Sequence, residues 1–243
     1  MSKITGMGSK LFLDGINITG QVGAIDTLAA PLSVGVCTDI SQLGFARQGL
    51  LRDGLLEFSS TWLNADGAHT KLDDLPTVDV SAVVAMPAGV GNIMARLGAK
   101  QVNYDMDRPE DGSLNTKVQC VGSDGLGLEY GIQLSAGDED FTGTAQTAST
   151  DNAVATTGGA LFVVCTEFTG TTLDVDLQQS TDDGAGDAFA NIDASASLTV
   201  TVEGSQRSTI GAAVGVERYV RANISGTFTT ATLLIGYTRG PVV

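Results

Sequence analysis

Hydrophobic and polar residues alternate with a period of two along much of the chain, which is the spacing of a half-buried β-strand. In residues 113–122, one set of alternate positions is Leu114, Thr116, Val118 and Cys120, and the other is Asn115, Lys117 and Gln119. After a turn at 123–125, one set is Leu128, Tyr130, Ile132 and Leu134, and the other is Glu129, Gly131, Gln133 and Ser135. The pattern predicts two antiparallel strands, each with an apolar and a polar face.

Other parts of the first half carry the same signal. Residues 10–20 form two short alternating runs separated by Asp14-Gly15, a dipeptide typical of tight hairpin turns. Residues 57–64 and 77–86 are further predicted strands, because apolar side chains recur there at every second position.

Helical spacing is scarce and limited to two stretches. Ala68, Leu72 and Leu75 lie at i, i+4 and i+7 before Pro76, which predicts a short amphipathic helix. A second short helix is predicted between Gly89 and Gly98, from the spacing of Val90, Ile93, Met94 and Leu97.

The second half is a series of predicted strands that no helical pattern interrupts, at 160–168, 172–180, 189–192, 197–204, 218–226 and 232–239. In one of them, Leu173, Val175 and Leu177 are expected to face the core. Asp174, Asp176 and Gln178 would then face solvent. Short strands at this density are typical of an immunoglobulin-like or jelly-roll β-sandwich.

The composition changes near residue 137. All five lysines precede this position, and 19 of 27 threonines follow it. Residues 138–158 are rich in Gly, Thr and Ala and have no periodicity, which is typical of a linker. We therefore expect a β domain at 1–137, a linker at 138–158 and a C-terminal β-sandwich at 159–243.

Charge and composition narrow the function. The chain has 243 residues and a net charge of −15, so it lacks the clustered Lys and Arg that bind phosphates. Three widely spaced cysteines are typical of buried free thiols in a reducing compartment. Neither a secretory signal nor a membrane span is expected, because no apolar run is long enough.

Candidate catalytic and metal-binding chemistry is sparse. The only histidine, His69, is followed by Asp73 and Asp74, a conceivable metal or acid/base pair, but an exposed histidine on a short helix explains it better. The acidic segments 105–112 and 182–187 resemble calcium loops only superficially, because their spacing departs from an EF-hand. We expect no catalytic residues, no cofactor and no metal, and a protein that works through its surfaces.

The segment 99–137 resembles the major tail, or tail-tube, proteins of long-tailed, non-contractile bacterial viruses. The resemblance lies in K-Q-V-N-Y-D at 100–105, D-G-S-L at 111–114, G-L-G-L-E-Y-G at 125–131 and L-S-A-G at 134–137. Residues 51–76 are similar to the family's preceding strand, loop and A-H-x-x-L-x-x-L-P helix. Two departures, Leu63 and Tyr130, replace the usual aromatic residue and the common Trp while keeping the apolar character.

The second half is similar to a sandwich that many proteins of this family carry, through segments 174–184 and 218–221. The resemblance implies that residues 1–137 form a mainly β, tail-tube-type sandwich or barrel with a short helix. It also implies a structural virion protein whose subunits form rings, typically six-fold, that stack into the tail tube. Synthesis and assembly would take place in the host cytoplasm. The implied partners are further copies of the chain, the tail terminator, tape-measure and baseplate proteins, and genomic DNA that passes through without specific binding.

Alternation within the last two strands of the first half suggests which side chains would line the tube. The candidate lumen-facing residues are Asn115, Lys117, Gln119, Glu129 and Gln133. The C-terminal sandwich is expected on the outer surface, because a domain inside the lumen would obstruct passage.

Two other classes of function remain open from the sequence. The first is a virion surface or decoration protein whose C-terminal sandwich binds carbohydrate, which exposed aromatic side chains on the sandwich would favour. The second is an enzyme such as a glycosidase, which would need two paired carboxylates in a cleft.

Overall fold

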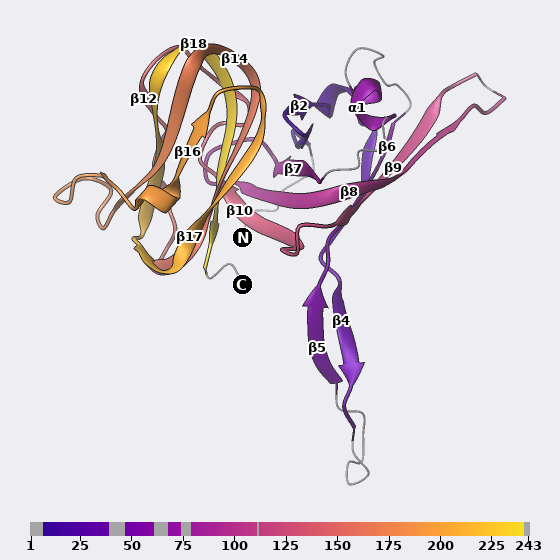
Figure 1. The fold of residues 1–243 in the computed structure, drawn as a ribbon, viewed down its shortest axis with the longest axis horizontal. Helices are drawn as coiled ribbons and strands as arrows, with labels where there is room; N and C mark the ends of the chain where they lie inside the picture. Colours follow the sequence, from indigo (N-terminus) through magenta and orange to yellow (C-terminus); the bar gives the residue numbers. More distant parts are fainter. Residues whose placement is uncertain (1–6, 39–46, 61–67, 74–78, 111, 241–243) are drawn as a thin grey trace. The chain divides into compact units, whose positions relative to one another are not determined.

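The computed structural model describes residues 7–38, 47–60, 68–73, 79–110 and 112–240. The chain is mainly β, which confirms the predicted fold class (Figure 1). The strands are β1 (Lys10–Leu13), β2 (Ile16–Asn17), β3 (Ala24–Ala29), β4 (Leu32–Val36), β5 (Arg47–Arg52), β6 (Leu55–Ser60), β7 (Val80–Met86), β8 (Ile93–Asp107), β9 (Asn115–Gly122), β10 (Leu128–Gln133), β11 (Glu139–Phe141), β12 (Ala145–Gln146), β13 (Thr150–Asp151), β14 (Thr156–Ser180), β15 (Ala190–Asn191), β16 (Ser197–Val200), β17 (Gly204–Val216) and β18 (Tyr219–Arg239). The helical elements are η1 (Thr19–Gln21), α1 (Thr70–Leu72) and η3 (Ala194–Ala196).

The chain divides into two compact units, and each draws on segments that are distant in sequence. Unit 1 contains residues 1–19, 81–96 and 130–243, and unit 2 contains residues 20–80 and 97–129. Strands β8 and β10 contribute residues to both units.

Unit 1 is built on the antiparallel pair of β14 and β18, which have 25 and 21 residues. Their register runs from Gly159 opposite Arg239 to Ser180 opposite Tyr219 and is interrupted by β-bulges. The other edge of β18 pairs with β10, β11, β12 and β13. The other edge of β14 pairs with β15, β16 and β17.

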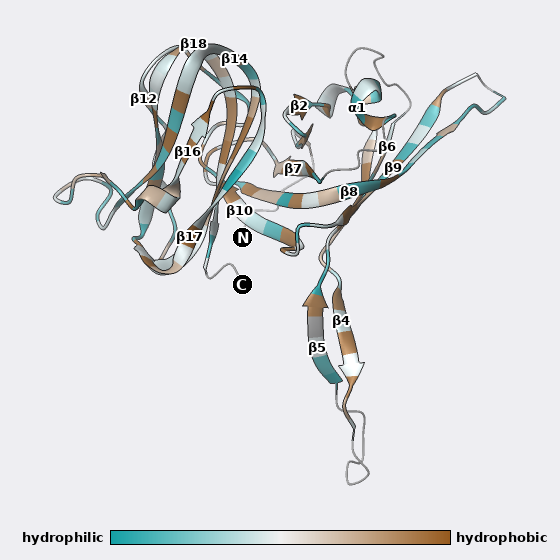
Figure 2. Ribbon diagram, viewed as in Figure 1, coloured by the Kyte–Doolittle hydropathy of each residue, from teal (hydrophilic) through white to brown (hydrophobic). Residues whose placement is uncertain are grey.

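The main core of unit 1 lies on the apolar face of this strand pair. Leu173, Val175 and Leu177 are fully buried, which confirms the predicted inward face of that segment. Val220, Ile224 and further residues of β18 join the same cluster. Figure 2 shows hydrophobic positions recurring along both strands. Burial of the alternate apolar side chains therefore fixes the register, because a slip by one residue would expose them all.

A second core in unit 1 combines residues from both sides of position 137. It contains Phe12, Val83, Ala85 and Met94 together with Ala160, Phe162, Val164 and Leu234. The first and last parts of the chain therefore pack together here. The division into a domain at 1–137 and a sandwich at 159–243 therefore stays a prediction.

The segment 138–158, expected as a linker, contains three short strands along β18. Asp140 lies opposite Thr232, Ala145 opposite Ile224, and Thr150 opposite Val220. Each strand is only two or three residues long, which is too short for a periodic pattern to be visible in the sequence. Pairing with the long strand β18 therefore orders these segments, although their own sequence carries no strand pattern.

Unit 2 contains a sheet in the order β3, β6, β9 and β8. In β9, Thr116, Val118 and Cys120 are buried while the residues between them are exposed or half-buried, which confirms the predicted alternation. Phe58 of β6 lies opposite Val118 and is also buried.

Two of the predicted turns and helices are confirmed. The turn at Asp14-Gly15 joins β1 to β2, and both residues have positive φ (46° and 84°), as a two-residue hairpin turn requires. The helix before Pro76 is present as α1, with Ala68 and Leu72 fully buried. The predicted strand residue Trp62 and the helix residues Leu75 and Pro76 lie outside the described residues.

The prediction of a helix between Gly89 and Gly98 is wrong. Residues 93–107 form the long strand β8, and Gly89 and Gly91 both have positive φ in the turn before it. The apolar spacing that suggested a helix arises because both faces of the strand are covered: Met94, Ala95 and Leu97 are all buried. Burial on both faces removes the period of two.

The prediction of one apolar face for residues 128–135 is also wrong. Tyr130 is 52% exposed, whereas Gln133 is fully buried. Glu129 and Leu128 are buried next to each other. Strict alternation fails here because the strand passes from unit 2 into unit 1, where different surroundings cover its side chains.

Substitution of Gly159 tests the importance of close packing between β14 and β18. Gly159 has φ +140°, and a Cβ there would overlap the carbonyl oxygen of Thr238. We expect Gly159→Ala to lower the free energy of unfolding by about 2–5 kcal/mol, through backbone strain and overpacking. Gly143→Ala is the matched control, because nothing lies within 4 Å of its Cβ position. Urea denaturation measures both variants, and equal midpoints would contradict the prediction.

Candidate assembly surfaces

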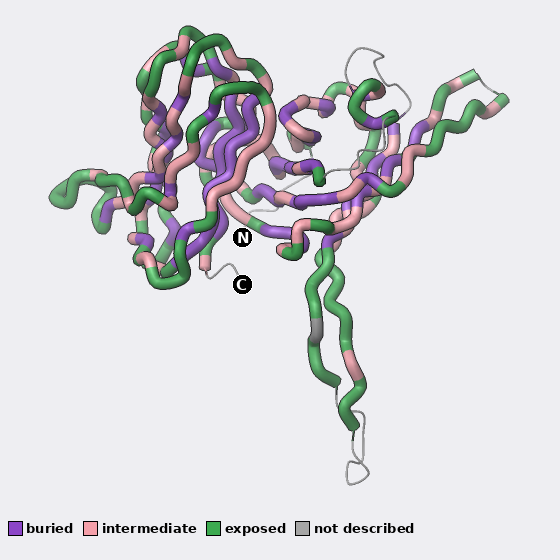
Figure 3. Tube along the Cα trace, viewed as in Figure 1, coloured by how far each residue is buried: buried purple, intermediate pink, exposed green. Residues whose placement is uncertain are grey.

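The β4–β5 hairpin (residues 32–36 and 47–52) forms a two-stranded sheet of its own in unit 2. Its register places Leu32 opposite Arg52, Val34 opposite Gly49 and Val36 opposite Arg47. Figure 3 shows the hairpin exposed along almost its whole described length. The hairpin is therefore an element that its own unit leaves uncovered.

One face of this hairpin is apolar. Leu32, Val34 and Val36 occupy alternate positions of β4 and are 49%, 56% and 62% exposed. The register partners Arg47 and Arg52 lie on the same face, one beside each end of the apolar row. We call this surface the hairpin face; in Figure 2, brown hydrophobic bands recur along the β4 ribbon.

The hairpin face has a physical need for a partner. An isolated two-stranded hairpin is marginally stable in water. Covering the exposed halves of three such side chains would contribute about 2–4 kcal/mol, at about 1.5–3 kcal/mol for full burial of each. An exposed apolar row on a strand is a surface for association. The alternation of apolar residues in β4 is visible in the sequence. The sequence does not show that both faces of the described hairpin are exposed.

The candidate lumen residues of β9 lie on the accessible face of the unit 2 sheet. Lys117 is exposed, and Asn115 and Gln119 are half-buried. The Nε2 of Gln119 donates a hydrogen bond to Oε1 of Glu57 on β6 at 2.7 Å. All three side chains therefore keep some solvent exposure at the surface of the protomer.

Gln133 has a different role from its neighbours in the candidate lumen set. Its Nε2 donates to the carbonyl oxygens of Pro87 (2.7 Å) and Ile93 (3.0 Å), and its Oε1 accepts from the Gly89 N–H (3.0 Å). The side chain thus closes the turn between β7 and β8 from inside. Because Gln133 is fully buried in the protomer, a lumen role would rest on the other candidates, and Glu129 is itself only 8% exposed.

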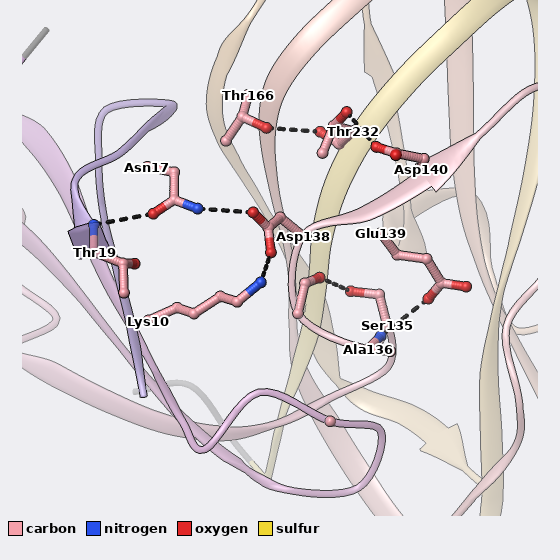
Figure 4. Close-up of polar contacts among 12 residues, drawn as sticks. Lys10, Asn17, Thr19, Ser135, Ala136, Asp138, Glu139, Asp140, Thr166 and Thr232 are labelled. Atoms are coloured by element: carbon pink, nitrogen blue, oxygen red, sulfur yellow. Dashed lines mark hydrogen bonds and ion pairs between the residues drawn. The ribbon is translucent and has the colours of Figure 1, made fainter. Parts of the chain in front are cut away.

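A polar junction in unit 1, which the sequence did not reveal, fastens the first strands to residue 138 (Figure 4). Asp138 forms an ion pair with Lys10 and accepts a hydrogen bond from Nδ2 of Asn17 at 2.7 Å. The Oδ1 of Asn17 accepts from the Thr19 N–H at 3.0 Å. Since these groups are 121 residues apart in sequence, no local pattern could have predicted the contact.

The residues singled out for chemistry have structural partners. His69 Nδ1 lies 2.7 Å from the Tyr104 hydroxyl, and its Nε2 lies 3.9 Å from an oxygen of Asp73. In the segment 182–187, the Asp182 carboxylate accepts backbone N–H groups of Gly186 and Asp187, which lowers its pKa. Among the described residues, no group of three His, Cys, Asp or Glu side chains could hold a metal ion.

Thiol exposure distinguishes the three cysteines. Cys37, just after β4, is exposed, whereas Cys120 and Cys165 are buried. Burial raises the pKa of Cys120 to about 12 and that of Cys165 to about 11. In the parts of the chain described, no helix has the length and apolar character needed to cross a membrane.

The sandwich offers little aromatic surface for carbohydrate. None of the six aromatic side chains in residues 159–243 is exposed. Phe162 and Tyr237 are buried, and Phe168 and Phe228 pack against the core. The guanidinium of Arg221 lies 4.1 Å from the centre of the Phe189 ring, and that of Arg218 lies 5.0 Å from the Tyr219 ring. The observation that would favour a carbohydrate-binding sandwich is therefore lacking in these residues.

No protein-family model matches this chain, and no curated protein matches it. Solved structures show distant likenesses. A chain of the tube-terminating cap of the anti-feeding prophage has 7% identity and a TM-score of 0.43, covering 54% of this chain and 93% of that chain. A chain from the virion of a native gene transfer agent has 14% identity and a TM-score of 0.42, covering 51% and 97%. The SPP1 Dit protein, described as a hub of the adsorption apparatus in phages that infect Gram-positive bacteria, has 12% identity and a TM-score of 0.34, covering 94% and 98%. At these scores the likenesses do not assign the chain to a family.

Replacement of Gln133 tests whether it is a core or a surface residue. Gln133→Leu would leave the N–H of Gly89 and two carbonyl oxygens without their side-chain partner. We expect a loss of about 2–4 kcal/mol in the free energy of unfolding. Gln119→Leu, which loses one half-exposed contact, should change it by less than about 1 kcal/mol. Chemical denaturation of both variants checks this, and similar small losses would place Gln133 outside the core.

Proposed function

We propose that this chain is a structural virion protein that self-assembles into stacked, six-fold rings forming the tail tube of a long-tailed, non-contractile bacterial virus. The tube would be the conduit for genome delivery into the host. The observation that carries the proposal is the hairpin face, an exposed apolar row on an element that pairs with no further strand in the part of the chain that the structure describes. The ordered motifs of residues 99–137 support it independently.

Ring formation suits a chain with open strand edges. In unit 2, β3 pairs with β6 on one side, and no second partner is described for it. Closure of a ring would cover such edges, which an open sheet presents as sites for aggregation. A contact between two different patches also propagates, as a stacked tube requires.

The charge of the chain suits a conduit. A wall with net charge −15 per subunit repels a polyanion and so allows it to slide. A positive lumen would hold DNA through salt-sensitive contacts. The chain would act without catalysis, together with terminator, tape-measure and baseplate proteins, with its C-terminal sandwich on the outside. Asn115, Lys117 and Gln119 are the strongest candidates for the lumen surface, because each keeps some exposure in the protomer.

A charge placed in the apolar row tests self-assembly. Negative-stain microscopy of the purified chain should show rings or tubes, and Val34→Asp should abolish them because burial of an unpaired carboxylate is costly. Val154→Asp is the matched control, since Val154 is 59% exposed against 56% for Val34. It should assemble as the unmodified chain does. If the unmodified chain stays monomeric, the proposal is wrong.

Thiol labelling of assembled tubes tests the lumen surface. In a Cys37→Ser background, the thiol of Lys117→Cys should react with a small maleimide and resist a large polyethylene-glycol maleimide. Buried Cys120 and Cys165, with their raised pKa values, should stay silent near pH 7.5. The thiol of Val154→Cys should react with both reagents. If the large reagent modified Lys117→Cys as fast in tubes as in free subunits, the residue would lie outside the lumen.

A further inference from the structure

Lys10 and Asp138 form a mostly buried ion pair inside unit 1. Their side chains are 29% and 19% exposed, whereas those of Lys100 and Asp79 are 40% and 43% exposed in the other lysine–aspartate pair. In the described part of the chain, Oδ1 of Asp138 is buried and accepts no hydrogen bond, so the Lys10 ammonium is the group that it faces. A lysine nitrogen and a carboxyl group therefore meet where little water separates them.

The backbone holds both side chains in position. Lys10 begins β1, which pairs with β7, and Asp138 directly precedes β11, which pairs with β18. A Cβ at Gly137 would lie 3.3 Å from Nζ of Lys10, so the glycine leaves room for the amine end of the lysine to approach the chain. Two reacting groups held in this way have a high effective concentration, about 10⁵ M or more when their orientation is good.

A third side chain completes the junction (Figure 4). Nδ2 of Asn17 donates a hydrogen bond to Oδ2 of Asp138 at 2.7 Å, and its own Oδ1 accepts from the Thr19 N–H at 3.0 Å. The second contact fixes the orientation of the amide, with its N–H directed at the carboxyl group. An N–H donor in this place stabilises negative charge on the oxygen as a nucleophile attacks the carboxyl carbon.

We propose that Lys10 and Asp138 condense into an amide cross-link between Nζ and Cγ. The ammonium gives one proton to Oδ1, and the neutral amine attacks Cγ while Asn17 supports the charge on Oδ2. A second proton passes from the nitrogen to Oδ1, the bond between Cγ and Oδ1 breaks, and water leaves. The amide nitrogen keeps one hydrogen, and no oxidant or reductant takes part.

The surroundings of the pair favour this step. Burial penalises both charges of an ion pair, whereas an amide carries none. Proton transfer from an ammonium to a carboxylate is also easier in a site with little water than in bulk solvent, because burial favours both neutral forms. The pair of Arg218 and Asp151 lacks this chemistry, because its side chains are 48% and 44% exposed and a guanidinium stays protonated.

The cross-link would fasten the first strands of unit 1 permanently to the segment that opens β11. It closes a covalent loop through about half of the chain, which restricts the unfolded state. Because the bond lies within one chain, it is independent of self-assembly and of the proposed function.

Mass spectrometry of the purified, full-length chain tests the proposal. The intact mass should fall below the mass of the sequence by one water molecule. Trypsin should fail to cut after Lys10, and tandem spectra should show one branched peptide that contains both Lys10 and Asp138. A full intact mass together with normal cleavage after Lys10 would leave only an ion pair and overturn the proposal.

Two lysine variants serve as controls. Lys10→Arg keeps the positive charge but cannot form the bond, so it should have its full mass. Lys100→Arg alters the more exposed pair and should still lose one water. Closure of a succinimide at an Asp-Gly sequence also removes one water, but that loss would persist in Lys10→Arg and give no branched peptide. Native maleimide labelling that leaves Cys165 silent shows that unit 1 is folded in each variant.

The donor from Asn17 has a test of its own. In cell-free synthesis, the intact mass followed over time gives the rate at which the bond closes. Asn17→Ala should close at least about tenfold more slowly, because removal of one such donor has a large effect on acyl transfer. Closure at the unmodified rate would show that Asn17 takes no part in the step and overturn its assigned role.

Discussion

The long antiparallel pairing of β14 with β18 is the constraint on which unit 1 depends. These strands have 25 and 21 residues, and seven other strands attach to their outer edges. Strands of two or three residues such as β12 and β15 have too few hydrogen bonds to persist alone. Their order is a consequence of the central pair. The glycine at position 159 marks how closely the two backbones approach, since no side chain fits there.

Unit 2 buries its apolar side chains less completely than unit 1 does. Its sheet buries Phe58, Val118 and Cys120, yet the β4–β5 hairpin and the outer end of the β8–β9 hairpin, at Met106 and Leu114, keep apolar side chains in solvent. Apolar surface on projecting strands is costly for a free monomer and useful in an assembly. Under the proposed function, unit 2 would supply contacts between subunits. The polar groups described inside the protomer, such as Gln133 and Asp138, serve a turn and a junction.

The burial of individual polar residues could be predicted from the sequence only in part. Alternation correctly assigned the faces of β9, because that strand lies within one sheet with one covered side. It failed at Gln133, whose amide is buried to satisfy the turn at residues 87–93, and at Tyr130, which is exposed. Neither outcome has a local signal, since the same glutamine could equally face solvent. The Lys10–Asp138 ion pair is likewise invisible until the fold brings the two residues together.

The sequence by itself determined the mainly β class, the turn at Asp14-Gly15, the inward face of residues 173–177 and the acidic character of the surface. Each follows from local periodicity, turn chemistry or composition, which need no knowledge of distant neighbours. The tertiary structure decided that residues 93–107 are a strand, and that residues from both ends of the chain share a core. It also decided that Leu32, Val34 and Val36 lie bare on a separate hairpin. Burial depends on which segments meet, and only long-range packing settles that.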